Sequence, residues 1–353
     1  MRLEDLRGLV LSSALVNTRV PRAALDITAA VQSILPLIEA VKANGEAELV
    51  ATALKFDGFD PRPIKVSRDE LTQALESLDP DLREAIETSI RRVRAVSQAS
   101  LPSPISVKLA EGAQVHQRWQ PVDSVGLYVP GGKAVYPSSV IMNVVPAQVA
   151  GVPKLAIATP GQQAFGGRPH PTVLATAALL GVDEVYAIGG PAAIAAFAFG
   201  IAEIGLEPVM MVTGPGNIFV AAAKRALRGQ IGIDSEAGTT EILIVADETA
   251  DARLIAFDLV SQAEHDEAAA CVLVTHSADL IRAVQEELAI VVESTENAAR
   301  VSAALAGVQS ALVLVDDLSA AKAFANHYAT EHLELHTANP KADAQDISNA
   351  GAI

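Results

Sequence analysis

The stretch EILIVADETADARLIAFDLVSQAEHDEAAACVLVT occupies residues 241–275 and decides the fold class. It begins with a nearly continuous apolar run, EILIVA (Glu241–Ala246), and ends with another, CVLVT (271–275). Between these runs, residues 252–264 have the apolar spacing of a helix. Continuous apolar runs are expected for parallel strands that are covered on both faces. The stretch therefore predicts a strand–helix–strand unit with a right-handed crossover.

The same alternation of apolar strands and helices continues on both sides of this unit. Since a domain takes about 150 residues, the chain of 353 residues is expected to hold about two. Alternation of this kind predicts an α/β protein with doubly wound parallel sheets. Further strands are expected at Lys154–Thr159, 184–188, 209–213, 311–315 and His332–His336, and further helices at 138–150, 171–180, 192–204, 218–228, 278–287 and 320–329.

The N-terminal part of the chain has helical spacing. Residues 23–55 place apolar side chains three or four positions apart, and breaks are expected near Pro36 and Gly45. Two further helix starts are marked by capping patterns, one at Ser67 and Glu70 and the other at Asp79-Pro80, the second helix running to about residue 97.

Composition and charge exclude several classes of protein. Half of the residues are hydrophobic, which rules out a disordered chain, and the formal net charge of −16 opposes binding to nucleic acid. The single cysteine, Cys271, excludes an intrachain disulfide and a cysteine-cluster metal site. The N-terminus has no signal-peptide pattern, and the longest apolar stretch, 192–202, is shorter than the roughly 20 residues that cross a bilayer. We therefore expect a soluble cytoplasmic protein without a membrane partner.

Two glycine-containing segments resemble nucleotide-binding loops without matching their patterns. Gly214-Pro-Gly-Asn217 follows a strand and opens a helix, but it lacks the third glycine of G-x-G-x-x-G. Gly131-Gly-Lys-Ala134 has the wrong glycine spacing for a phosphate loop. Either segment could present backbone amides to an anion at a helix N-terminus, and the alternative for both is a tight turn that needs glycine torsions.

Two short polar segments combine residue types that bind metals or move protons. Gln262 and His265 lie three residues apart at the end of a predicted helix, so they share one face, and their donor atoms suit a borderline metal. Glu331 and His332 offer two proton-transfer groups of different basicity at a strand start. For each pair the alternative is an ordinary exposed polar surface. The remaining histidines are interpreted as structural or surface residues: His116, His170, His276, His327 and His336.

Five long segments add a stronger signal: GLYVPGGKAVYPSSVIMNVVPAQVAGV (126–152), TGPGNIFVAAAKR (213–225), GIDSEAGTTEILIVAD (232–247), DLVSQAEHDE (258–267) and NHYATEHLEL (326–335). In residue identity, order and spacing these segments resemble the histidinol dehydrogenase family, and the resemblance covers essentially the whole chain. It implies oxidation of L-histidinol through L-histidinal to L-histidine by a homodimer that uses zinc and NAD.

The resemblance also implies two incomplete Rossmann-like domains and small terminal domains. On this chain it places an N-terminal segment at 1–22, a discontinuous first domain at 23–120 and 238–353, and a nested second domain at 121–237. The family continues beyond the position of Ile353 with a third zinc ligand and a C-terminal domain that gives the fourth ligand to the partner. We therefore expect that domain to be absent from residues 1–353, and zinc binding and turnover by these residues alone to be weak.

Residue by residue, the resemblance assigns roles to several side chains. Gln262 and His265 match zinc ligands that hold the substrate. His332 matches the general base for the alcohol step, and Glu331 matches the residue that activates water for the aldehyde step. The other matches are Thr240 as a substrate contact and Tyr128 and Asn217 as NAD contacts.

Departures from the family pattern leave two alternatives open. Ala192 stands in place of a cofactor-contacting glutamine, and Thr239 and Thr330 stand in place of prolines. These changes favour a related zinc- and NAD-dependent dehydrogenase of another polar alcohol, which a substrate panel would reveal. The absent ligands favour a non-catalytic chain, against which tight stoichiometric zinc binding would count.

Overall fold

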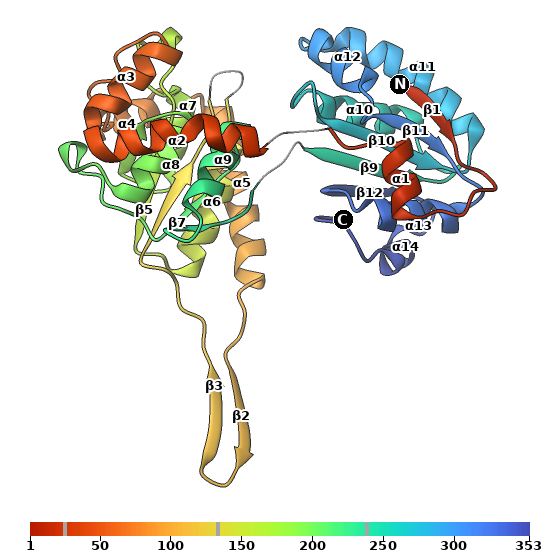
Figure 1. The fold of residues 1–353 in the computed structure, drawn as a ribbon, viewed down its shortest axis with the longest axis horizontal. Coiled ribbons are helices and arrows are strands. Elements are labelled where there is room, and N and C mark those ends of the chain that lie inside the picture. Colours follow the sequence, from red (N-terminus) through yellow and green to blue (C-terminus); the bar gives the residue numbers. More distant parts are fainter. Residues whose placement is uncertain (24–26, 132–134, 237–239) are drawn as a thin grey trace. The chain divides into compact units, whose positions relative to one another are not determined.

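The structure, a computed structural model, describes residues 1–23, 27–131, 135–236 and 240–353. The chain divides into two compact units, shown in Figure 1. Unit 1 consists of Met1–Leu25 and Gly238–Ile353, and unit 2 consists of Asp26–Ala237. No helix among the described residues is both long and apolar enough to cross a membrane.

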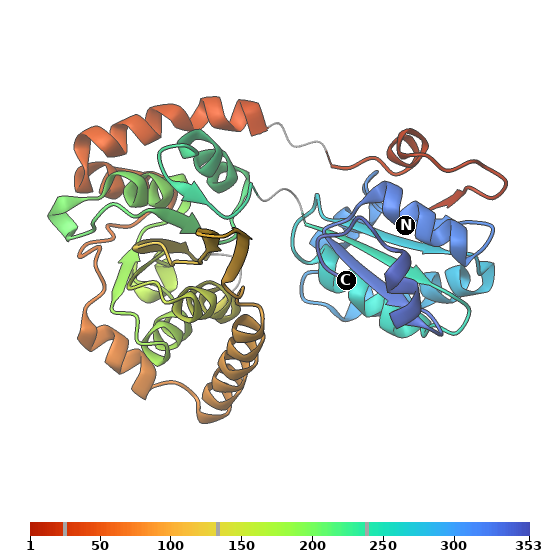
Figure 2. The same cartoon turned by 90° about the horizontal axis from the view of Figure 1, so that it is seen from below.

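Unit 1 is built on a five-stranded parallel sheet with helices on both faces (Figures 1 and 2). Side chains alternate across β9, so that Ile242 and Ile244 face one helical layer and Leu243 and Val245 face the other. The strand order is β1 (Arg2–Asp5), β11 (Ala311–Leu314), β10 (Ala270–Thr275), β9 (Glu241–Ala246) and β12 (His332–His336). One face packs on α10 (Ala252–Ala263), α11 (Ala278–Ser294) and α12 (Ala298–Ala306), and the other on α1 (Ser13–Arg19) and α13 (Leu318–Tyr328). The short α14 (Pro340–Asp343) and η3 (Ala344–Asp346) follow β12.

Unit 2 has a second five-stranded parallel sheet, again between two helical layers. Its order is β6 (Glu184–Ala187), β5 (Lys154–Thr159), β4 (Ser124–Tyr128), β7 (Met211–Thr213) and β8 (Gly232–Ile233). One layer contains α2 (Ile27–Asn44), α8 (Gly190–Phe199) and α9 (Ile218–Leu227), and α3 (Glu46–Phe56) follows α2. The other contains α4 (Arg68–Glu76), α5 (Pro80–Ala99), α6 (Pro137–Ala150) and α7 (Pro171–Leu179). The turns η1 (Gln163–Phe165) and η2 (Ala202–Ile204) complete the unit, and the hairpin of β2 (Ile105–Ala110) and β3 (Ala113–Gln117) extends away from its body (Figure 1).

In both sheets, the side on which successive strands are added reverses once along the chain. In unit 2 the strands are added outward from β4 to β5 and β6, and the chain then returns to place β7 on the other side of β4. In unit 1 the same happens from β9 to β10 and β11, with β12 returning to the other side of β9. In open sheets of this kind, the carboxyl ends of the strands at the reversal form a crevice that commonly binds ligands.

The expected assignment of residues 23–120 to the domain that holds 238–353 is wrong for residues 26–120. The apolar stripe of α2, including Ile34 and Ile38, joins the core beneath the sheet of unit 2. Leu71 of α4 and Ile86 of α5 join the core on the opposite face of the same sheet. These helices therefore belong to unit 2 because their buried faces are covered by its strands.

Most expected helices and strands are present, but helix boundaries that were expected near Pro36 and beyond Gly200 differ in the structure. The capping box of Ser67 and Glu70 is formed as predicted. The helix expected to break near Pro36 continues through it as α2, because Pro36 lies on the exposed side, where water can bind the carbonyl that loses its amide partner. The helix expected at 192–204 ends earlier, at Phe199, where Gly200 adopts a positive φ. Strands β1, β2, β4 and β8 and helices α1, α12 and α14 are additional to the prediction.

Candidate active site

Three of the predicted side chains lie where strands of unit 1 begin. Thr240 directly precedes β9 and Glu331 directly precedes β12, which begins at His332. The two strands are neighbours in the sheet, with His332 opposite Ile242. These residues therefore share the amino edge of the sheet, which is opposite to the edge where doubly wound sheets usually bind ligands.

Helix α10 brings Gln262 to the same edge. The helix leaves the carboxyl end of β9 and returns to the start of β10, so its last turn lies beside the first residues of β9. Gln262 is 8% exposed, and its Nε2 donates a hydrogen bond of 2.7 Å to Oγ1 of Thr240. Because the amide donates through nitrogen, its carbonyl oxygen remains available as an acceptor or a metal ligand. His265 follows the helix and is exposed.

Glu331 and His332 are close enough to act on one substrate. Oε1 of Glu331 lies 3.7 Å from Nε2 of His332, and each side chain is about half exposed (51% and 50%). The other carboxylate oxygen of Glu331 accepts a hydrogen bond of 3.2 Å from the backbone N–H of Glu241. Strand alternation does not separate the two side chains, because Glu331 precedes the first residue of β12.

A hollow of about 330 Å³ lies beside these residues. Gln262 and His332 both line it, whereas Thr240, His265 and Glu331 do not. Its other lining residues are Ile242, Asp258, Ser261, Leu333, Glu334, Ala352 and Ile353. The structure thus brings the predicted ligand Gln262 and the predicted base His332 to one surface.

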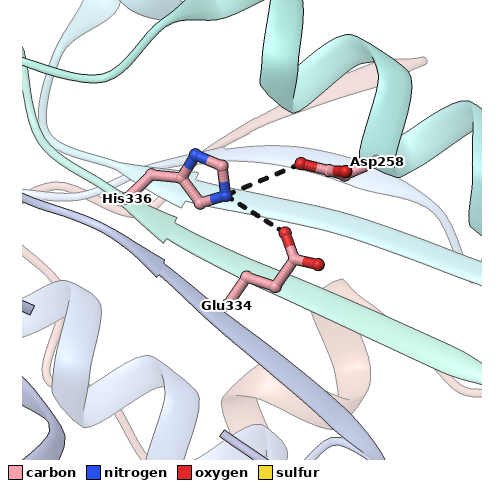
Figure 3. A group of neighbouring side chains, drawn as sticks. All are labelled: Asp258, Glu334 and His336. Carbon is pink, nitrogen blue, oxygen red and sulfur yellow. Dashed lines mark hydrogen bonds and ion pairs between the residues drawn. The ribbon is translucent and has the colours of Figure 1, made fainter. Parts of the chain in front are cut away.

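Two acidic residues at this hollow, Asp258 and Glu334, form a cluster with His336, which was predicted to be a structural or surface residue (Figure 3). Nε2 of His336 lies 3.1 Å from Oε2 of Glu334 and 3.6 Å from Oδ2 of Asp258. The hydrogen bond with Glu334 raises the pKa of His336, and burial together with Glu334 raises the pKa of Asp258. The alternation of Glu334 and His336 along β12 is the sequence signal for this pair, but nothing in the sequence places Asp258 beside them. The three groups interact with one another, so the histidine can offset the two carboxylates when it is protonated.

The predicted NAD contacts lie in unit 2, at the reversal between β4 and β7. Tyr128 ends β4 and is 4% exposed, and its hydroxyl accepts a hydrogen bond of 3.0 Å from the N–H of Gly190 at the start of α8. Burial raises the pKa of this phenol. Asn217 follows β7 as the N-cap of α9, and its Oδ1 accepts from the N–H groups of Phe219 and Val220.

A buried ion pair holds the glycine loop between β7 and α9. Nζ of Lys224, which is 2% exposed, donates to Oδ1 of Asp234 at 2.6 Å and to the carbonyl of Gly214. The N–H of Gly214 donates to the other oxygen of Asp234 at 2.8 Å. Gly214 has a φ of +122°, so the tight turn that needs a glycine is present. A lysine directly after the alanine run AAA (221–223) is the sequence signal for this pair.

The departures from the family pattern and the segment that resembles a phosphate loop are only partly within the described residues. Ala192, expected in place of a cofactor-contacting glutamine, is packed in the core at 1% exposure. Thr330 is also buried, and its hydroxyl has no hydrogen-bond partner within the described chain. Of the expected phosphate-loop-like segment 131–134, residues 132–134 lie outside the described residues, as does Thr239.

Comparison with known proteins identifies what the chain is similar to. The sequence model of the histidinol dehydrogenase family matches residues 20–353. The histidinol dehydrogenase of Leifsonia xyli subsp. xyli is 55% identical, with alignment over 100% of this chain and 81% of the relative. That of Mycolicibacterium smegmatis is 53% identical over 99% of this chain and 79% of the relative. The crystal structure of histidinol dehydrogenase from Elizabethkingia anophelis superimposes with a TM-score of 0.91 at 30% identity, covering 100% of this chain and 79% of that one.

Proposed function

This chain belongs to the histidinol dehydrogenase family of oxidoreductases in histidine biosynthesis, and we propose that it oxidises L-histidinol through L-histidinal to L-histidine. The observation that carries this reaction is the geometry at the amino edge of the unit 1 sheet. There a carboxylate and an imidazole lie 3.7 Å apart, and the imidazole shares a hollow with Gln262.

The two steps require two different bases. In the first step, Nε2 of His332 removes the hydroxyl proton of the alcohol, for which an imidazole is suited because its ordinary pKa lies near neutrality. In the second step, the Glu331 carboxylate takes a proton from the water that adds to the aldehyde carbon. The backbone N–H of Glu241 fixes one oxygen of Glu331, so that the other remains free to accept that proton.

The residues that would hold zinc are Gln262 and His265. Because the Gln262 amide nitrogen donates to Thr240, its carbonyl oxygen remains available as a metal ligand. The exposed imidazole of His265 supplies a nitrogen ligand, so the two ligand atoms fit a borderline metal. When bound, zinc would hold the polar groups of the substrate, and NAD would accept the hydride of each step. Thr240 orients Gln262 and is proposed as a substrate contact.

Unit 2 is proposed to bind NAD as an incomplete Rossmann-like domain. Numbered from β4, its strand order is 3-2-1-4-5, which is the order of the dinucleotide-binding sheets without the sixth strand. Tyr128 and the loop that ends at Asn217 lie at the reversal in this order, where such sheets bind their ligand. Because Tyr128 is buried and Asn217 caps α9, we propose that they act chiefly by shaping the glycine turns that meet the cofactor.

The exposed hairpin supports the proposed homodimer. Ile105, Val107, Leu109 and Val115 are all exposed large apolar side chains on β2 and β3. A two-stranded hairpin is marginally stable by itself, so burial against a second copy would stabilise it. Location in the cytoplasm stays a prediction.

The first experiment follows NADH formation by the purified protein with L-histidinol and with L-histidinal. We expect His332→Ala to lower alcohol oxidation by about 100-fold or more, since general bases contribute about 10²- to 10⁴-fold. Glu331→Gln should lower aldehyde oxidation more strongly than alcohol oxidation. His327→Ala is the matched control, because this histidine contacts Ser13 rather than the hollow.

Each outcome decides between the candidate functions. Near-normal turnover by a folded His332→Ala protein would reject His332 as the base. Activity on other polar alcohols with none on L-histidinol would favour a related dehydrogenase. Absence of both activity and stoichiometric zinc binding would favour a non-catalytic chain.

A further inference from the structure

Arg22 lies in the N-terminal segment, far from Glu331 in the sequence, yet its contacts converge on the residues around Glu331. Its Nη1 donates to both carboxylate oxygens of Glu241, at 2.8 and 2.6 Å. Its Nη2 donates to the carbonyl of Tyr328 and, at 2.8 Å, to the carbonyl of Ala329. The guanidinium also lies 5.0 Å from the centre of the Tyr328 ring.

These contacts satisfy groups that would otherwise be unpaired. The carbonyls of Tyr328 and Ala329 are at the C-terminal end of α13, where helix carbonyls have no intrahelical donor and where a cation is favourable. The carboxylate of Glu241 is only 7% exposed, and Arg22 is its ion-pair partner. Burial raises the pKa of Glu241, whereas the charge of Arg22 lowers it.

The same contacts affect both the backbone that leads to Glu331 and the position of its carboxylate. On the backbone side, Ala329 has a φ of 53°, a left-handed conformation that side chains with a Cβ rarely adopt, and it lies two residues before Glu331. On the side-chain side, the backbone N–H that holds the Glu331 carboxylate belongs to Glu241. Arg22 therefore joins the turn that delivers Glu331 to the residue whose amide fixes its carboxylate.

We propose that Arg22 is a positioning residue for Glu331 and thereby for the aldehyde step. This inference rests on the proposed function, in which Glu331 activates water. Arg22 acts in two ways: it holds the turn at Ala329, and it neutralises the carboxylate of Glu241, which would otherwise repel that of Glu331. The planar guanidinium bonds the carboxylate and two carbonyls at once, which a lysine ammonium cannot reproduce in the same geometry.

The test compares the two half-reactions in Arg22→Ala, Arg22→Lys and Glu331→Gln. We expect Arg22→Ala to lower kcat with L-histidinal about tenfold or more, while KM and single-turnover oxidation of L-histidinol change less than threefold. Arg22→Lys should recover part of the loss. The double variant Arg22→Ala/Glu331→Gln should be no slower than Glu331→Gln alone. Arg19→Ala is the matched control, because Arg19 lies in the same segment but pairs with Glu4 at 3.4 Å.

The outcomes separate this inference from the function beneath it. If Glu331→Gln leaves the aldehyde step intact, the proposed role of Glu331 fails. If Glu331→Gln abolishes that step but Arg22→Ala does not slow it, or slows both half-reactions equally, the positioning role is wrong. Additive losses in the double variant would also overturn it. Should Arg22→Ala fail to fold by circular dichroism, Arg22→Lys decides, with a smaller loss that is confined to the aldehyde step expected from it.

Discussion

Gly214 shows how a single residue shapes the proposed cofactor site. A Cβ built at this position would lie 2.1 Å from the carbonyl oxygen of Tyr128, and its φ of +122° disfavours any side chain. We therefore expect Gly214→Ala to lower the free energy of unfolding by about 3 kcal/mol or more and to weaken NAD binding, because the loop must move. Thermal unfolding and NADH titration measure the two effects.

Gly229→Ala separates backbone strain from collision. Gly229 also has a positive φ, +104°, but an added Cβ would meet no atom within 4 Å. Its replacement should cost about 1–2 kcal/mol through strain alone and leave NAD binding unchanged. If Gly214→Ala and Gly229→Ala had equal effects on unfolding free energy and NAD binding, the close approach of Gly214 to Tyr128 would contribute to neither.

The titration of His336 reports on the cluster beside the hollow. Its pKa is raised by the hydrogen bond with Glu334, so the folded state binds a proton more tightly than the unfolded chain. This stabilisation is fully present below the ordinary histidine pKa of about 6.5 and is lost as the pH rises through the folded value. We expect Glu334→Gln to lower the pKa of His336 in an NMR titration and to flatten the decline of stability as the pH rises above about 6.5. An unchanged His336 titration would contradict the contact in Figure 3.

Candidate site residues can be proposed from the sequence where their chemistry is local. Gln262 with His265 and Glu331 with His332 are visible as short spacings, and the resemblance assigned their roles. The partners that orient them are not visible in this way. Thr240 meets Gln262, and Glu241 meets Glu331, only because β9 lies next to both α10 and β12. That adjacency is a property of the sheet order, which no local pattern encodes.

At the scale of elements, Lys224 of α9 ties three segments together. Its ammonium group bridges Asp234, after β8, and the Gly214 carbonyl, after β7. Lys224→Met would leave both acceptors without this donor, so we expect a loss of about 1–3 kcal/mol in unfolding free energy, moderated because Asp234 is 33% exposed. Chemical denaturation measures the loss.

Lys154→Met is the matched control for this element-scale effect. Lys154 pairs with Glu207 at the same distance, 2.6 Å, but the two side chains are 67% and 73% exposed. An exposed pair is screened by water, so this substitution should change stability by no more than about 0.5 kcal/mol. A loss as large as that of Lys224→Met would mean that burial does not distinguish the pairs.

Elements were predicted best where one period dominates. The apolar runs of β5, β9 and β10 and the caps of α4 and α5 lie where the sequence placed them. Strand β4 was missed although all five of its residues are buried. Its central residue is Gly126, and glycine weakens the local preference for a strand. Glycine is required at this position because a Cβ there would lie 2.5 Å from the Phe197 ring. A tertiary contact thus removed the local signal for the strand.

At the scale of the whole molecule, the division into units depends on which faces meet. The prediction had the chain leave a discontinuous domain after residue 120 and re-enter it at residue 238; the structure has a unit boundary at 238, but the chain leaves unit 1 already after Leu25. It could not place the helices of 27–99, because an apolar stripe specifies burial without naming the sheet that covers it. Ile34 and Ile86 pack on opposite faces of the unit 2 sheet, a fact available only from three-dimensional contacts.

The exposed apolar side chains of the hairpin of β2 and β3 predict where two copies of the chain associate. Ile105 and Val107 alternate along β2 and so point to one face, which Val115 shares because it pairs directly with Val107. Leu109 follows at the irregularity between Lys108 and Ala110. All four are exposed, at 48–67%. If this face packs against a second copy, Val107→Lys/Leu109→Lys should weaken the dimer at least tenfold, since each buried aliphatic side chain contributes roughly 1.5–3 kcal/mol.

Sedimentation across a concentration series checks this shift toward the monomer. Leu54→Lys is the matched control, because Leu54 is also exposed, at 52%, but lies on α3 in the body of unit 2. Circular dichroism should be unchanged in both variants, because β2 and β3 contact little besides each other. A dimer that is equally stable in the hairpin variant and the control would exclude the hairpin as the interface. Loss of the dimer in the hairpin variant alone would assign the exposed apolar face to self-association.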